Sequence, residues 1–328
     1  MEEEKRDVFA SYHPIVNLLF FLLVLVITMF SQHPMVLIIS FLAASSYAVL
    51  LKGLKKVARF NFLFTLPAMV IVAFVNPAFN HYGVTPLFYL KTGAVTLEAV
   101  VYGVVLACNL FIIILWFTCY NEIMTSDKFI YLFGRIIPAM SLVLSMALRF
   151  VPKFIEQVKE IRNGQKCIGR DIKNGGFIKK IKYGIKIISI LVTWSLENAI
   201  ETSDSMKARG YGLKGRTAFS LYKLDKRDKI MLTILGMLFL IFCEGVKAGY
   251  TNAIYDPMIK IGGMTLSVGV IFTWLAFATL CFIPCILQGY EAILWKKLYG
   301  KIEEERNIPS YLYTLMGEER IGEKEHGR

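Results

Sequence analysis

Six stretches of the chain are apolar and carry few or no charged residues. At about 1.5 Å of rise per residue, a helix over each stretch can cross most of a hydrocarbon layer about 30 Å thick. The pattern therefore predicts six membrane-spanning helices, over residues 14–30, 35–51, 60–75, 97–118, 230–243 with a continuation to 248, and 264–287. Just residues 31–34 separate the first two, which predicts an antiparallel hairpin.

The segment between the fourth and fifth stretches mixes apolar and charged residues with a helical period. Its first apolar set predicts an amphipathic helix that ends at Gly164 or Gly169. A second set is flanked by lysines, and a third helix, over 194–208, carries carboxylates. The apolar runs 138–151 and 187–196 are too short to cross a membrane and favour re-entrant or interfacial helices. The three sets are Phe150, Phe154, Val158 and Ile161; Ile178, Ile181, Ile185 and Ile188 with Lys179, Lys182 and Lys186; and Glu197, Glu201 and Asp204.

Basic residues gather in this same segment. The chain has 37 lysines and arginines against 25 aspartates and glutamates, a net charge of +12. Residues 149–229 hold 19 basic and 8 acidic residues, so +11 of the net charge lies there. Because basic residues near span ends stay on the cytoplasmic side, the segment and the basic loop at 52–59 are expected in the cytoplasm. Both termini then also lie in the cytoplasm, in a multi-pass protein of the cell membrane.

Several classes of function are disfavoured by the residues. There is no GxxxxGK motif followed by Ser or Thr, so this chain is not expected to hydrolyse ATP itself. The six cysteines and four histidines lack metal-ligand spacing, and we expect no metal, cofactor, catalytic group or nucleic-acid partner. Glu98 and Glu244 lie near span ends, where solvated carboxylates are expected. A self-sufficient secondary transporter is the alternative, but it calls for ionisable groups at mid-membrane and internal repeats.

Two motifs in the basic segment resemble the signatures of one family, the T component of energy-coupling factor (ECF) transporters, also called CbiQ/EcfT. Each motif alone is weak, and their order and spacing carry the resemblance, over about residues 10 to 300. The motifs are Met146-Ala147-Leu148-Arg149-Phe150-Val151-Pro152 followed by Gln165, and Ala208-Arg209-Gly210-Tyr211-Gly212, with support from residues 76–83, 96–99 and Pro138.

The resemblance implies a non-catalytic membrane scaffold with two cytoplasmic coupling helices. In that family each coupling helix ends in an Ala-Arg-Gly-like triplet that docks into one of two ABC-type ATPases, and the scaffold also holds a substrate-binding S component. Ala208, Arg209 and Gly210 match the second triplet in full. The first triplet is Cys167-Ile168-Gly169, with isoleucine in place of arginine. Arg170 can replace the missing cation only if the helix has already ended at Gly169, because each further helical residue turns the side chain by about 100°.

The expected protein is therefore an all-α integral membrane protein, with about six transmembrane helices plus cytoplasmic amphipathic coupling helices. Its expected function is that of the T subunit of an ECF importer for a vitamin or a transition-metal ion such as cobalt or nickel. Ile178, Ile181, Ile185 and Ile188 are expected to contact the S component or the lipid bilayer. The expected division is four spans in 1–137, the coupling helices in 138–229, two spans in 230–300 and a charged cytoplasmic tail in 301–328.

Overall fold

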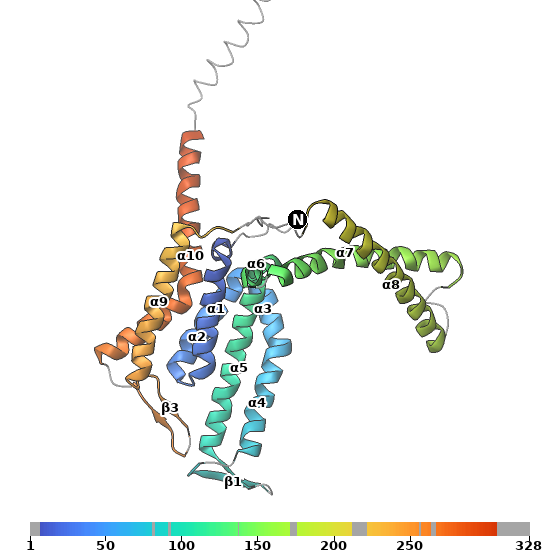
Figure 1. Cartoon of the computed structure of the whole chain (residues 1–328). Helices are drawn as coiled ribbons and strands as arrows, with labels where there is room; N and C mark the ends of the chain where they lie inside the picture. Colours follow the sequence, from blue (N-terminus) through green and yellow to red (C-terminus); the bar gives the residue numbers. More distant parts are fainter. Residues whose placement is uncertain are drawn as a thin grey trace, which may run out of the picture. The chain divides into compact units, whose positions relative to one another are not determined.

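The structure is a computed structural model, and almost all of it is helical (Figure 1). It describes residues 7–80, 83–90, 93–136, 138–170, 176–211, 222–255, 257–263 and 267–306. Parts of segments named above therefore lie outside the described residues: 81–82, Gly212 and most of the tail. The chain forms two compact units, one from Met1–Met124 with Leu224–Arg328 and one from Thr125–Lys223.

The first unit contains the long apolar helices. Five of the described helices have the length and composition to cross a membrane: Pro34–Lys52, Leu54–Phe79, Leu97–Ile123, Lys226–Lys247 and Val268–Tyr299; a sixth apolar helix, Pro14–Phe30, is shorter. The predicted apolar stretches are thus helical over most of their described residues, and the all-α membrane fold is confirmed. Residues 264–266 of the last stretch lie outside the described residues. The elements are η1 (Phe9–Ser11), α1 (Pro14–Phe30), α2 (Pro34–Lys52), α3 (Leu54–Phe60), η2 (Asn61–Thr65), α4 (Leu66–Phe79), α5 (Leu97–Ile123), α9 (Lys226–Lys247) and α10 (Val268–Arg306).

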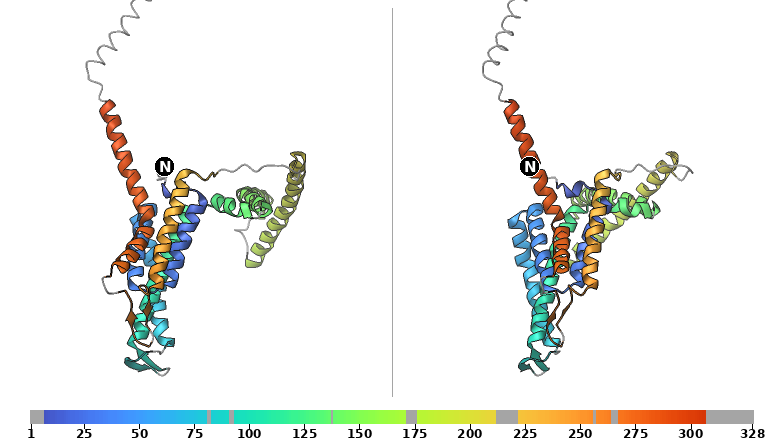
Figure 2. Two further views of the ribbon diagram at one scale, coloured as in Figure 1. Left: turned by 60° about the vertical axis from the view of Figure 1, so that its left-hand side comes forward. Right: turned by 90° about the vertical axis from the view of Figure 1, so that its left-hand side faces the viewer.

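Two short antiparallel sheets lie in the connections of this unit. Strand β1 (Pro86–Leu90) pairs with β2 (Gly93–Thr96) ahead of α5, and β3 (Ala253–Ile254) pairs with β4 (Lys260–Ile261) between α9 and α10. In Figures 1 and 2, α9 and α10 lie side by side, as do α4 and α5. Glycines allow both contacts: a Cβ on Gly103 would lie 2.9 Å from the carbonyl oxygen of Ala73, and one on Gly245 would lie 2.3 Å from Thr273 Oγ1.

Helices α1 and α2 begin in the same way, with a histidine at the N-cap and a proline at the first helical position. The Nδ1 atom of His13 accepts a hydrogen bond from the Ile15 amide at 3.2 Å, and that of His33 accepts one from the Met35 amide at 3.2 Å. Because Nδ1 of His33 is an acceptor, its Nε2 carries the proton and donates to the carbonyl oxygen of Gly262 at 2.9 Å. His33 thereby ties the start of α2 to the segment before α10.

The basic loop predicted at 52–59 is largely the helix α3. Gly53, with φ +79°, ends α2, and the chain then continues as helix through η2 into α4. The turn η2 is π-helical, with the Leu66 amide bonded to the carbonyl oxygen of Asn61. Pro67 follows and has no amide hydrogen to donate, so the usual bond to the fourth preceding carbonyl is missing at that point. A wider turn of this kind is the local result.

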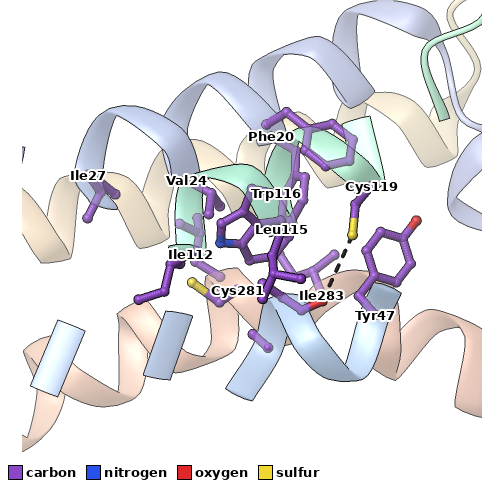
Figure 3. Packing of buried hydrophobic residues seen from close by; sticks show 14 of the residues in the cluster. Phe20, Val24, Ile27, Tyr47, Ile112, Leu115, Trp116, Cys119, Cys281 and Ile283 are labelled. Atoms are coloured by element: carbon purple, nitrogen blue, oxygen red, sulfur yellow. Dashed lines mark hydrogen bonds between the residues drawn. The ribbon is translucent and has the colours of Figure 1, made fainter. Parts of the chain in front are cut away.

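The core of the first unit is built around Trp116 of α5 (Figure 3). Its indole Nε1 donates to Ser40 Oγ on α2 at 2.8 Å, and Phe20 of α1 meets the ring edge-on with centroids 5.9 Å apart. Cys119 and Cys281 are buried here as small core residues, and the Cys119 thiol also donates to the carbonyl oxygen of Ala44 at 3.9 Å (Figure 3). The cluster joins α1, α2, α5, α9 and α10, which explains why these helices form one body.

The second unit consists of α6 (Ser126–Ile136), α7 (Pro138–Cys167) and α8 (Phe177–Ala208). The sequence pattern predicted two helices over the region of α8, but the structure has one continuous helix of 32 residues there. The prediction of a break was wrong because residues 189–193 contain no proline or glycine to interrupt the helix. Likewise, the apolar run 138–151 is the first half of α7 rather than a separate helix.

Candidate functional site

The end of α8 is a tight reversal built on a glycine. Arg209 is the C-cap residue, and Gly210 takes φ +78°, a left-handed conformation that a residue with a Cβ atom adopts at a cost. The Gly210 amide donates to the carbonyl oxygen of Lys207 at 2.9 Å, and the Tyr211 amide donates to that of Met206 at 3.1 Å. This pair of bonds is a Schellman motif, which satisfies carbonyls left free at a helix end.

Helix α7 ends in the same motif. Gly169 has φ +78°, its amide donates to the carbonyl oxygen of Lys166 at 3.0 Å, and the Arg170 amide donates to that of Gln165 at 2.9 Å. The two ends therefore correspond residue by residue. Ile168 holds the position of Arg209, and Arg170 holds the position of Tyr211.

This correspondence shows that Arg170 and Arg209 occupy different positions relative to their helix ends. The helix has ended at Gly169, so the geometric condition for Arg170 to serve as a cation of the first tip is met. Arg170 nevertheless follows the reversal, one position beyond the glycine, whereas Arg209 precedes its glycine. At the position equivalent to Arg209, the first helix presents the Ile168 side chain, which is 61% exposed. The two tips thus share a backbone and differ in chemistry.

Helices α7 and α8 enclose a groove of about 700 Å³ next to the second tip. Arg149 and Glu156 of α7 line it together with Glu201 and Arg209 of α8. Lys153 fixes the crossing of the helices: its Nζ donates to Asn198 Oδ1 at 3.1 Å and lies 5.4 Å from the centroid of the Trp194 ring. The sequence contains no signal for this contact, because no local pattern pairs residues 45 positions apart.

The isoleucine stripe of α8 lies on the surface of the second unit. Ile178, Ile181, Ile185 and Ile188 are between 48% and 81% exposed. Among the described side chains of α8, Ile187 is the buried one. The stripe is therefore not part of a core within this unit.

A second cavity, of about 390 Å³, lies in the first unit and is lined by Gln32, Glu98, Tyr102 and Tyr255 among others. The prediction that Glu98 is solvated was wrong, because its side chain is buried. The carboxylate accepts hydrogen bonds from the Thr85 hydroxyl at 2.8 Å and from the Thr85 amide at 3.3 Å. Glu244 is exposed, as expected, and pairs with Lys247 at 2.9 Å. The Tyr255 hydroxyl donates to the carbonyl oxygen of Gln32 at 2.9 Å, and burial raises the pKa of this tyrosine above its ordinary value. The polar groups of this cavity thus hold the ends of α2 and α5 and the β3–β4 connection.

Comparison with known proteins identifies the family. The family CbiQ, described as cobalt transport protein, matches residues 7–219. The chain belongs to this family. The resemblance that the two motifs indicate is therefore confirmed.

Individual relatives match shorter portions of the CbiQ-family chain. The energy-coupling factor transporter transmembrane protein EcfT of Lactobacillus helveticus is 40% identical over 100 residues, 30% of this chain and 36% of the relative. EcfT of Lactococcus lactis is 36% identical over 94 residues, 28% of this chain and 35% of the relative. The uncharacterized protein MG181 of Mycoplasma genitalium is 27% identical over 177 residues, 51% of this chain and 42% of that protein. The chain thus spans less than half the length of each of these relatives.

Proposed function

We propose that this protein is the T subunit of an ECF importer, a non-catalytic scaffold that couples two ABC-type ATPases to a substrate-binding S component. The observation that carries the proposal is the pair of matched helix ends, in a multi-pass chain of the CbiQ family. Two exposed tips with one backbone geometry suit two related partner surfaces. Relatives named as energy-coupling factor transporter transmembrane proteins support the same reading.

The second tip supplies the main ionic contact in this proposal. Arg209 stays charged, and its planar guanidinium can grip a partner carboxylate with two hydrogen bonds. Gly210 reverses the chain directly behind it, so no following helical side chain blocks its approach to a partner groove. Ala208, the last helical residue, adds little bulk beside it.

The first tip presents an apolar side chain at the position where the second tip presents Arg209. Ile168 occupies the position of Arg209, with Cys167 before it and Gly169 and Arg170 after it. An exposed isoleucine favours an apolar partner surface, since burying it removes apolar area from water. The two partner sites would therefore differ, one being apolar and the other acidic, with Arg170 a secondary contact.

In this proposal the rest of the chain would follow the division expected from the sequence. Residues 1–137 and 230–300 would cross the cell membrane, residues 138–229 would face the ATPases in the cytoplasm, and both termini would be cytoplasmic. The membrane part and the stripe of α8 would hold the S component or contact lipid. The transported substrate would be a vitamin or a transition-metal ion, recognised by the S component.

The test is co-purification of the ATPases with tip variants, together with substrate uptake in cells. Truncating one member of a buried, hydrogen-bonded charge pair costs about 2–5 kcal/mol, so Arg209→Ala should weaken ATPase binding by roughly 30-fold or more, and Arg209→Glu further. Lys207→Ala is the matched control, because Lys207 is a neighbouring exposed cation that already pairs with Asp204 at 3.5 Å. Arg170→Ala should have a smaller effect than Arg209→Ala. Wild-type ATPase recovery and uptake with Arg209→Glu would refute the proposal.

A further inference from the structure

The two halves of α8 carry opposite charge along one apolar stripe. Residues 177–196 contain four lysines and no acidic residue, and residues 197–208 contain three carboxylates and one lysine. Exposed apolar side chains continue through both halves, with Ile185 at 62% and Ile200 at 65% exposure. The apolar surface is therefore continuous while the charge beside it reverses at about Glu197.

The lysines of the first half form a row beside the isoleucines. At about 100° per residue, Lys182 lies about 40° around the helix from Ile178, and Lys186 lies about 40° from Lys182 on the same side. All of these side chains are exposed in the structure. An apolar arc bordered by lysines is the arrangement of helices that lie in the surface plane of an anionic membrane.

The second half has different neighbours. Glu201 and Asn198 line the groove against α7, and Asn198 accepts a hydrogen bond from Lys153 of that helix. Carboxylates on this half would be repelled by anionic headgroups. Charge thus favours lipid contact over the first half of α8 and protein contact over the second.

We propose that residues 177–188 of α8 lie on the membrane surface and bind anionic phospholipid headgroups through Lys179, Lys182 and Lys186. This rests on the proposed function in one respect, since it requires the second unit to face the cytoplasmic leaflet. Contact with lipid would hold the first half of α8 at the membrane while the second half and its tip remain available to protein partners. Each lysine near such a surface strengthens binding about fivefold, so the three together contribute about a hundredfold.

The experiment uses the full chain alone, reconstituted in nanodiscs without other subunits. An environment-sensitive fluorophore is attached to Ile181→Cys, with the native cysteines replaced by alanine, and quenching by lipids brominated in their acyl chains is measured. Ile200→Cys, on the carboxylate-flanked half, is the matched control. With phosphatidylglycerol present, the label at 181 should be strongly quenched and the label at 200 weakly quenched. With phosphatidylcholine alone, or with Lys179, Lys182 and Lys186 changed to glutamine, quenching at 181 should fall several-fold.

Three results would overturn the proposal. An unquenched label at 181 in phosphatidylglycerol nanodiscs would show that the stripe is not at the membrane. Equal quenching in both lipids and in the glutamine variant would show apolar contact without headgroup recognition. Quenching at 181 that falls when a purified S component is added would assign the stripe to that protein instead.

The lipid contact and the proposed function fail in different ways. If Arg209→Glu retains the ATPases while the label at 181 still responds to phosphatidylglycerol, the coupling role falls and the lipid contact stands. If Arg209→Glu loses the ATPases while the glutamine variant keeps full quenching, the lipid contact falls and the coupling role stands.

Discussion

Alanine at position 210 should loosen the tip of α8 even though it adds a single methyl group. Gly210 has φ +78°, and a residue with a Cβ atom pays about 1–2 kcal/mol to adopt this left-handed conformation. The chain can instead give up the conformation and lose the bonds from the Gly210 amide to Lys207 and from the Tyr211 amide to Met206. Each bond is worth about 1 kcal/mol, so either route costs about 1–2 kcal/mol. The ordered tip should open about 5- to 30-fold more often.

Gly184→Ala is the matched control, because it makes the same substitution within the same helix. Gly184 lies inside α8, away from the left-handed region, and a Cβ there would meet nothing within 4 Å. Alanine should therefore stabilise the helix, by about 0.5–1 kcal/mol. The same added methyl group thus has opposite effects at the two positions.

Hydrogen exchange measured by mass spectrometry checks this directly. Peptides covering the amides of residues 210 and 211 should exchange about 5- to 30-fold faster in Gly210→Ala and no faster than wild type in Gly184→Ala. ATPase binding, measured on the same samples, should weaken by a similar factor in Gly210→Ala. Unchanged exchange at 210 and 211 in Gly210→Ala would refute the cap argument whatever happens to binding.

Three further predictions test other parts of the structure. Gly245→Ala should destabilise the first unit by about 1–3 kcal/mol, because its Cβ would lie 2.8 Å from Thr273 Cβ and no side-chain rotamer relieves that contact. Thermal stability in detergent measures the effect. Adding Thr273→Gly should restore stability, and a double variant that stays destabilised would contradict the packing. In intact cells an impermeant maleimide should not label Cys167, the exposed cysteine, until the membrane is opened; labelling from outside would reverse the topology. Ile168→Arg should weaken ATPase binding at the first tip by roughly tenfold, because the complex with an apolar partner surface would bury an unpaired charge. Tighter ATPase binding, measured by co-purification, would show instead that the partner surface is acidic.

Local patterns were sufficient for most of the helices. Runs such as 97–118 and 35–51 are apolar over enough residues that the bilayer leaves a helix as the favoured structure, and each is found within a few residues of its predicted bounds. The prediction for the segment 187–196 was wrong for a physical reason. It contains no charged residue to mark a polar face, so it resembles a separate interfacial helix although it is the middle of α8.

Long-range contacts set the features that the pattern could not give. The burial of Glu98 depends on its hydrogen bond with Thr85 and on the close approach of the backbone at Gly83, which has φ +138°. A Cβ on Gly83 would lie 2.6 Å from Glu98 Oε2. The triplets at 167–169 and 208–210 can be recognised in the amino-acid sequence alone. Their structural equivalence depends on the φ angles of Gly169 and Gly210. These angles make Ile168, rather than Arg170, the residue equivalent to Arg209.

The unbroken course of α8 has a mechanical consequence. Its 32 residues make a rod about 48 Å long, with the lysine-bordered end at Phe177 and the arginine tip at the other end. Because no joint absorbs bending along the way, a tilt of about 6° about one end carries the other through about 5 Å, close to one helical pitch. A small rotation imposed at Arg209 would therefore displace Phe177 by enough to shift whole side chains, with the helix itself acting as the lever arm.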